Sequence, residues 1–319
     1  MAHTRRFAAA LIAAGLFAPG AARAAAVIRG QDSRIPLSPN SPDAPYTPPA
    51  SLQAAVDLFR RMTTPVRLNG QGPFDFVVDT GANQTVLSAE LAARLGLPVG
   101  EPSPLNGVAG VQMTGTVHVK TLSVGPSLQT DVVLSVLPEA SIGGAGLLGV
   151  DGLDGKSLTL DFKARRLRIE ASEHAWRDPY AVKVAAQSRA GRLTIVDADL
   201  NGTPVRAFLD SGAQRSIGNR AMGAVATRIA PSTAWTTAPI ISATGQTTQG
   251  DVAVIPAIRI GGLLFQNLQV AFADLHIFRL WDLVDQPAIL LGVDVLSRFS
   301  SVALDFPRGE VRFGLPQQS

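Results

Sequence analysis

One short sequence occurs twice in the chain, and it restricts the possible folds more than any other feature. In residues 76–82 and again in 207–213, an apolar run ends in an aspartate, a small hydroxyl residue, a glycine and an alanine. Such an apolar run is typical of a buried strand, and an aspartate at its end is costly to bury unless it has a partner. The duplication therefore predicts two related lobes, each of which brings one carboxylate to a shared site.

The two aspartates, Asp79 and Asp210, form a chemically sensible pair. Two carboxylates at one place cannot both ionise cheaply, so their pKa values separate and they share a proton. The ionised member can take a proton from water while the protonated member donates to a carbonyl oxygen. We expect these two residues to be catalytic. Supporting roles are predicted for the small residues around them: Thr80, Gly81, Thr85, Ser211, Gly212 and Ser216.

A family resemblance rests on this loop and on a second repeated motif. Residues 79–82, followed by Thr85-Val86-Leu87, resemble the active-site loop of the retroviral-type aspartic proteases, the retropepsins, and the copy at 210–213 is similar. Residues 147–153 and 290–296 both begin Leu-Leu-Gly-Val-Asp, which resembles the hydrophobic-hydrophobic-Gly element of that family. The resemblance covers roughly residues 60–170 and 190–315.

The resemblance implies a fold, a reaction and a set of contacts. The fold is all-β, with two similar lobes and a cleft between them, because the chain looks like two retroviral halves fused and related to the pepsin-like proteases. The implied activity is that of an aspartic endopeptidase acting on a peptide or protein substrate, with no metal and no cofactor. A fused pair completes its own site, so a monomer is expected. The candidate substrate-binding residues are Asn83, Gln84, Gly107, Val108, Ala109, Gly110, Gln214 and Arg215.

The chain also departs from the family pattern. Ala82 and Ala213 stand where pepsins usually carry a hydroxyl residue that stabilises the ionised dyad, so the dyad's pKa values should be higher and the pH optimum less acidic than in pepsins. Retroviral enzymes usually have an acid–arginine pair, which this chain lacks in both copies. The residues at those positions are Asn83, Val150, Gln214 and Val293.

The ends of the chain suggest export. Residues 1–24 combine Arg5-Arg6, an apolar stretch over 7–17 and an Ala-x-Ala ending, which predicts a cleaved signal peptide and a periplasmic or secreted protein; the alternative of a membrane anchor is disfavoured by the short apolar stretch. A Pro-rich arm, 25–55, follows, with a propeptide as the alternative. The predicted lobes are 56–175 and 176–319.

Composition excludes several other function classes. Of the 28 Lys and Arg residues, three precede Ala25, so the mature chain has 25 basic and 25 acidic residues. This balance gives no reason to expect a nucleic-acid or membrane-surface protein. The absence of cysteine excludes disulfides and thiol chemistry, and the four histidines lack the spacing of zinc ligands.

Some assignments stay open at this point. The hairpin tip at 107–110 is either a flap over the cleft or an ordinary surface hairpin, and 278–287 is either an insertion near the cleft or a surface loop. Asp151 and Asp294 are expected to cap the helices that follow them rather than to catalyse. A rival function is that of an inactive exported protein that binds peptide or cell-wall material in the same cleft.

Overall fold

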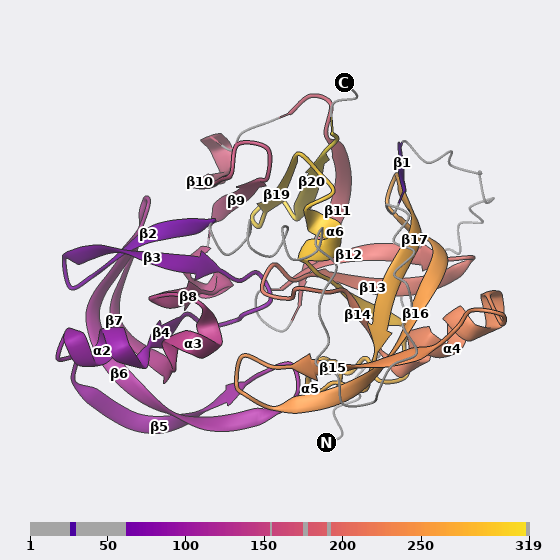
Figure 1. Ribbon diagram of the computed structural model, residues 1–319. Coiled ribbons are helices and arrows are strands. Elements are labelled where there is room, and N and C mark those ends of the chain that lie inside the picture. The colour runs from indigo at the N-terminus through magenta and orange to yellow at the C-terminus, as the bar shows by residue number, and fades with distance from the viewer. Residues whose placement is uncertain (1–25, 30–61, 154, 175–177, 190–192, 317–319) are drawn as a thin grey trace, which may run out of the picture.

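The computed structural model describes residues 26–29, 62–153, 155–174, 178–189 and 193–316. The predicted signal peptide and nearly all of the predicted arm therefore lie outside the described residues. Within them the expected all-β architecture is confirmed, because strands dominate and form two closed six-stranded barrels in tandem. Figure 1 shows the two lobes side by side, with the first in indigo to magenta and the second in orange to yellow.

The first lobe is one sheet of strand order β2-β3-β8-β4-β7-β6-β5, closed on itself by pairing of β2 with β6. Its elements are β2 (Thr63–Leu68), β3 (Gln71–Val78), β4 (Val86–Ser88), α2 (Ala89–Arg94), β5 (Val99–Asn106), β6 (Val111–Val124), β7 (Ser127–Leu137), α3 (Glu139–Ile142), β8 (Gly146–Leu148) and η1 (Val150–Leu153).

The second lobe repeats this topology strand for strand. Its order is β12-β13-β18-β14-β17-β16-β15, closed by pairing of β12 with β16. The elements are β11 (Val182–Arg189), β12 (Leu193–Leu200), β13 (Thr203–Leu209), β14 (Ile217–Gly218), α4 (Arg220–Ile229), β15 (Thr236–Ile241), β16 (Thr247–Ile260), β17 (Leu263–Phe272), α5 (His276–Leu280), β18 (Ala288–Leu291), α6 (Val293–Leu296), β19 (Ser301–Asp305) and β20 (Glu310–Gly314). The sequence duplication thus corresponds to a duplicated fold.

Matching turns show how local sequence builds both barrels. Asn69-Gly70 connects β2 to β3, and Asn201-Gly202 connects β12 to β13. All four residues have positive φ, at 51° and 77° in the first turn and 52° and 84° in the second. Asn and Gly tolerate this left-handed backbone, and the resulting turn matches the twist of the strands that it joins. Each hairpin places its second strand in register to carry an apolar run into the core.

A further set of strands joins the two lobes. Strands β9 (Lys156–Asp161) and β10 (Arg166–Ala171), followed by the short helix η2 (Ser172–His174), continue the order β10-β9-β19-β20-β11 into the second lobe. Leu158 lies opposite Leu304 across the β9–β19 pair, and both side chains are fully buried. The lobes therefore share one sheet (Figure 1), which fixes how they face each other.

Two helices, α2 and α4, begin at a residue whose side chain caps them. Ser88 accepts a hydrogen bond from Leu91 N at the start of α2, at 3.1 Å, as its position before an apolar-periodic stretch predicts. Asn219 does the same for α4 and is fully buried, because its amide also donates to the carbonyls of Leu283 and Gln286. This cap fixes the start of α4, the longer of the two helices, although its sequence is less regular than that of α2.

A short strand outside both barrels was not expected. Strand β1 (Ala26–Arg29) pairs in parallel with the start of β17, with Ala26 opposite Leu263 and Arg29 opposite Gln266. Its sequence lies in the region predicted as a Pro-rich arm. These four residues form an extended strand, and the strand belongs to the sheet of the second lobe.

Candidate active site

Each aspartate of the repeated motif directly follows a buried strand. Asp79 follows β3, and its main-chain N–H donates to Leu148 O of the parallel strand β8 at 3.0 Å. Asp210 follows β13 in the same way, and its N–H donates to Leu291 O of β18 at 3.0 Å. The Leu-Leu-Gly motifs thus supply the neighbouring strands that place the two aspartates, as the family resemblance predicts.

The structure brings Asp79 and Asp210 together, and their carboxyl groups hydrogen-bond each other. The glycines of the two motifs make this approach possible. A Cβ atom on Gly81 would lie 2.5 Å from Asp210 Cγ, and a Cβ on Gly212 would lie 2.5 Å from Asp79 Cγ. Real Cβ contacts are never that short, so only glycine fits beside the opposite carboxylate. Glycine is required here because each loop closely approaches the opposite carboxyl group, and not because its backbone has a positive φ.

Main-chain N–H groups hold both carboxyl groups in place. Asp79 Oδ1 accepts from Gly81 N at 2.9 Å and Ala82 N at 3.2 Å. Asp210 Oδ1 accepts from Gly212 N at 2.9 Å and from Ala213 N at 3.0 Å. The two loops are therefore near copies of each other in geometry, and they meet at the junction of the lobes.

The site raises the pKa of both carboxyl groups. Burial raises the pKa of Asp79, and the N–H groups of Gly81 and Ala82 oppose that effect. Burial, with repulsion from Asp79, raises the pKa of Asp210 from 3.8 to about 7. Because the two carboxyl groups are in contact, they titrate together, and their protons belong to the pair rather than to either residue.

This shift predicts how stability depends on pH. A carboxyl group whose pKa is higher in the folded state binds more protons when folded, so its contribution to stability is lost as pH rises. We expect the free energy of unfolding to fall between pH 3.8 and about 7, by up to about 1.4 kcal/mol per pH unit for each proton released. Denaturant titration across that range should show the decline, and Asp210→Asn should flatten it. An equally steep decline in the variant would contradict the assignment.

Thr80 and Ser211 interlock the two loops. Thr80 N donates to Ser211 Oγ at 3.0 Å, and Ser211 N donates to Thr80 Oγ1 at 3.0 Å. The hydroxyls then donate across the interface, from Thr80 to Leu209 O at 2.9 Å and from Ser211 to Val78 O at 3.1 Å. Thr80 is 2% exposed and Ser211 is 0% exposed. These four bonds join the two loops across the junction of the lobes.

Thr85 fixes the first loop from behind. Its N–H and Oγ1 both donate to the carboxylate of Asp151, at 3.0 and 2.7 Å, and its Oγ1 accepts from Gly149 N at 3.1 Å. The hydroxyl that returns six positions after the aspartate therefore ties the loop to the Leu-Leu-Gly-Val-Asp motif.

Ser216 makes the equivalent bonds in the second lobe. It donates to Asp294 from N at 3.1 Å and from Oγ at 2.8 Å, and its Oγ accepts from Gly292 N at 3.1 Å. The prediction that Asp151 and Asp294 cap the following helices is wrong. In α6 the N-cap residue is Gly292, with no side-chain cap bond. The carboxylates of Asp151 and Asp294 instead accept hydrogen bonds from Thr85 and Ser216, in the loops that carry Asp79 and Asp210. The sequence signal for this pairing is that both copies have a hydroxyl residue six positions after the first aspartate and a later Leu-Leu-Gly-Val-Asp motif.

The predicted substrate contacts lie on the outer parts of the same loops. Gln84 and Gln214 are exposed, and Asn83 is half-buried. Arg215 is half-buried, and its Nη1 donates to Gln269 Oε1 at 3.0 Å. Burial lowers the pKa of Arg215, and the charge of Asp294 opposes that effect. Its guanidinium is thus held within the second lobe, and a direct role in substrate choice stays a prediction.

The hairpin tip at 107–110 is more than a surface hairpin. Gly107 N donates to Gly110 O at 2.8 Å, which closes the turn between β5 and β6. The tip lies against the second lobe, where Gln246 Nε2 donates to Val111 O at 3.3 Å. Gln246 belongs to the turn at 242–246 between β15 and β16, the equivalent hairpin of the second lobe. The two hairpins therefore meet, as flaps over a shared cleft would.

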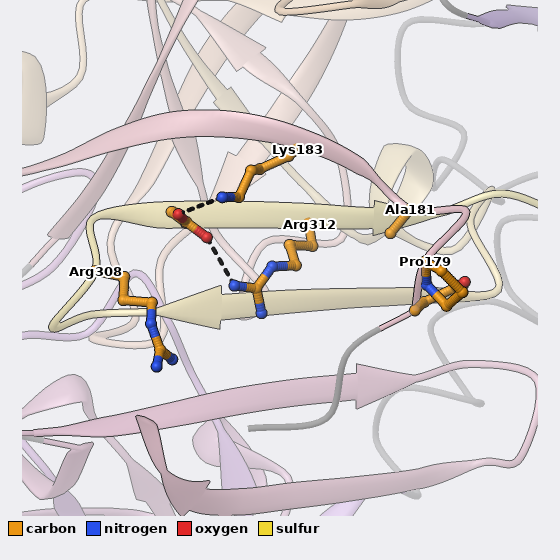
Figure 2. A pocket seen from close by; sticks show the side chains of 7 residues that line it. Pro179, Ala181, Lys183, Arg308 and Arg312 are labelled. Carbon is orange, nitrogen blue, oxygen red and sulfur yellow. Dashed lines mark hydrogen bonds and ion pairs between the residues drawn. The ribbon is translucent and has the colours of Figure 1, made fainter. Parts of the chain in front are cut away.

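Other features of the described residues lie apart from the dyad. A cavity of about 440 Å³ lies over the shared sheet, where Glu310 accepts from Lys183 at 2.6 Å and from Arg312 at 2.7 Å (Figure 2). None of the dyad residues lines it. The described part of the chain contains no group of three or more potential metal ligands and no helix long and apolar enough to cross a membrane.

Comparison with known protein families agrees with this geometry. Residues 64–154 match the family model described as "gag-polyprotein putative aspartyl protease", and residues 196–295 match the model described as "Aspartyl protease". A search of curated proteins found no match. Each family match covers one lobe, with its aspartate loop and its Leu-Leu-Gly motif. The chain therefore belongs to the retropepsin-like aspartic proteases, with both halves of the fold in one polypeptide.

Proposed function

We propose that the protein is an aspartic endopeptidase in which Asp79 and Asp210 form the catalytic dyad. The observation that carries this proposal is the contact between the two carboxyl groups, with the pKa of both raised by burial. Asp210 is buried and Asp79 half-buried, which would be costly for a purely structural purpose, since among the described residues neither carboxylate is paired with a cation. Proton sharing in a covered site is the arrangement that general acid–base chemistry requires.

The chemistry follows from the shared proton. The ionised carboxylate takes a proton from a water molecule, and the water oxygen forms a bond to the peptide carbonyl carbon. The protonated carboxyl group donates its proton to the carbonyl oxygen, which gives a neutral tetrahedral gem-diol. In the second step the protonated carboxyl group gives its proton to the amide nitrogen while the ionised one takes a proton from a gem-diol hydroxyl. The C–N bond breaks, and a carboxylic acid and an amine leave. The dyad ends with one proton, as it began.

The N–H groups of the two loops keep the dyad aligned for this reaction. Each Oδ1 atom already accepts two main-chain bonds, so the outer oxygens are left for water and substrate. Ala82 and Ala213 provide no hydroxyl. The ionised form therefore has fewer donors than it has in pepsins, which agrees with a raised pKa.

A cleavage assay tests the proposal directly. The protein lacking residues 1–24 would be incubated with a library of unstructured peptides between pH 3 and pH 7, and the products identified by mass spectrometry. The matched control is the Asp79→Asn, Asp210→Asn double variant, purified in the same way. Cleavage by the wild type alone, inhibited by a pepstatin-type compound, would support the dyad. Equal cleavage by both proteins would trace the activity to a contaminant and contradict it.

The pH profile makes a second, independent prediction. The active form carries one proton on the dyad, so activity should fall once the pH is high enough to remove that proton. With the pKa of Asp210 raised to about 7, kcat/KM should decline above about pH 7, approaching tenfold per pH unit. The acidic limb of the profile, where activity falls as the pH decreases, should lie at a higher pH than that of pepsins. Measured profiles of kcat/KM with one fluorogenic peptide would check this, and a maximum near pH 2 would refute it.

The location and assembly of the enzyme are part of the same proposal. The leader over 1–24 supports export to the periplasm or the medium, and the presence of both loops in one chain supports activity as a monomer. Cell fractionation with N-terminal sequencing of the mature protein tests the first point. Light scattering of the active protein tests the second, since a dimer as the sole active species would contradict it.

A further inference from the structure

The flap of the first lobe, defined here as residues 106–111, ends on the second lobe. A Cβ on Gly107 would lie 2.5 Å from Ser242 Oγ and still closer to Thr244 Oγ1. Ser242 and Thr244 are both buried and hydrogen-bond each other at 2.7 Å. The flap therefore sits in a polar notch that only a glycine can enter, made by the turn of the opposite hairpin.

A second contact comes from α5, a segment for which the sequence suggested no counterpart. Ile277 N, in the first turn of α5, donates to Val108 O at 3.4 Å. His276 Nε2 lies 3.0 Å from Asn106 Oδ1. The helix thus binds both the flap tip and the strand end beside it, through one main-chain and one side-chain bond.

The side chain of Val108 adds an apolar contact. It packs against a small hydrophobic cluster of the second lobe that is separate from the main core. In this cluster the rings of Phe208 and Trp281 stack with centroids 4.3 Å apart. Phe208 is on β13, two residues before Asp210. The cluster against which Val108 packs therefore includes a side chain of the strand that carries the second aspartate.

The arrangement is not repeated in the first lobe. The element in the position equivalent to α5, between β7 and β8, is the single turn of α3. Its first N–H, from Glu139, donates to Glu90 Oε2 of α2 in its own lobe at 2.9 Å. Among the described residues, the structure gives α3 no hydrogen bond to the turn at 242–246. The contacts of the two hairpin tips are thus asymmetric. The first flap is bonded both to the opposite hairpin and to α5, whereas the turn at 242–246 is bonded to the first flap but, among the described residues, not to α3.

From these contacts we infer that residues 274–287, here called the latch, hold the first flap against the second lobe in the substrate-free protein. His276 is the positioning residue that fixes the flap through Asn106. The inference rests on the proposed function, because the flap covers the cleft of that activity. Substrate then enters by release of the first flap from α5, and closure over bound peptide returns Val108 to its apolar cluster.

Hydrogen exchange tests the latch without substrate or activity, so its failure is distinct from failure of the proposed peptidase. In the full mature protein, His276→Ala should speed exchange at the amides of Gly107 and Ile277 by about fivefold, the expected effect of one lost hydrogen bond. His276→Gln should restore slow exchange, because its amide can donate to Asn106. His118→Ala is the control, since His118 is an exposed residue of β6 in the same hairpin.

Two outcomes would overturn the latch. One is unchanged exchange in His276→Ala, and the other is exchange in His276→Gln as fast as in His276→Ala. A double-mutant cycle with Asn106→Ala tests the same hydrogen bond even if one single variant disturbs another part of the fold. The combined variant should exchange no faster than either single one, because both remove the same bond. Additive effects would show that His276 acts independently of the flap and would also overturn the proposal.

Discussion

Replacing Asp210 with asparagine is expected to abolish peptide cleavage, with kcat lowered about 10³-fold or more. Asparagine cannot hold the shared proton, so the dyad loses either its base or its acid, and water attack and carbonyl protonation no longer occur together. The fold should survive. The Oδ1 atom of asparagine can still accept from Gly212 N and Ala213 N, which lie 2.9 and 3.0 Å from Asp210 Oδ1 in the wild type.

Single-turnover kinetics with a fluorogenic peptide measure this loss, and peptide affinity measured on the same variant separates catalysis from binding. Asp161→Asn is the matched control, because Asp161 also ends a strand and accepts a main-chain N–H, from Ala164 at 2.8 Å. That variant should keep wild-type kcat. Cleavage by Asp210→Asn within tenfold of wild type would place the chemistry elsewhere in the molecule.

Repetition made the centre of the site predictable from the sequence. A single Asp-Thr-Gly could be an ordinary turn. The second copy, Asp-Ser-Gly at 210–212, and the paired Leu-Leu-Gly motifs leave few folds in which both copies have a role. The same repetition predicts that Thr80 and Ser211 join the two loops, and in the structure each main-chain N–H donates to the other residue's hydroxyl. Where the two lobes carry equivalent residues, an assignment in one could be checked against the other.

The errors and gaps lie where partners are distant in sequence or unique to one lobe. Asp151 was assigned to a nearby helix end, although its partner is Thr85, 66 positions earlier. A local sequence pattern indicates only those partners that lie close by in the sequence. The contact of α5 with the flap has no copy in the first lobe, and nothing in residues 276–280 indicates which strand end they would meet. Such contacts depend on how two folded units face each other.

Thr80→Val should have the second largest effect on stability and activity, after Asp210→Asn. It removes one hydroxyl from the hydrogen bonds that join the two loops while keeping the size of the side chain. Thr80 Oγ1 donates to Leu209 O at 2.9 Å and accepts from Ser211 N at 3.0 Å. Both partners would be left unsatisfied in a buried interface, since Ser211 is 0% and Leu209 1% exposed. Each unsatisfied buried group costs about 1–3 kcal/mol, so a loss of about 2–5 kcal/mol in the free energy of unfolding is expected.

The loss should reach catalysis as well, since Thr80 directly follows Asp79 and Ser211 follows Asp210. A shift of the loops by a fraction of an ångström is enough to lower kcat by about 10²-fold. Thr80→Ser is the control, because serine keeps the hydroxyl and position 211 already uses serine in the equivalent bonds. Chemical denaturation and kcat should therefore rank wild type and Thr80→Ser together, well above Thr80→Val. A valine variant as stable and active as the serine one would mean that shape alone joins the loops, and that the four hydrogen bonds contribute nothing to holding the carboxyl groups together.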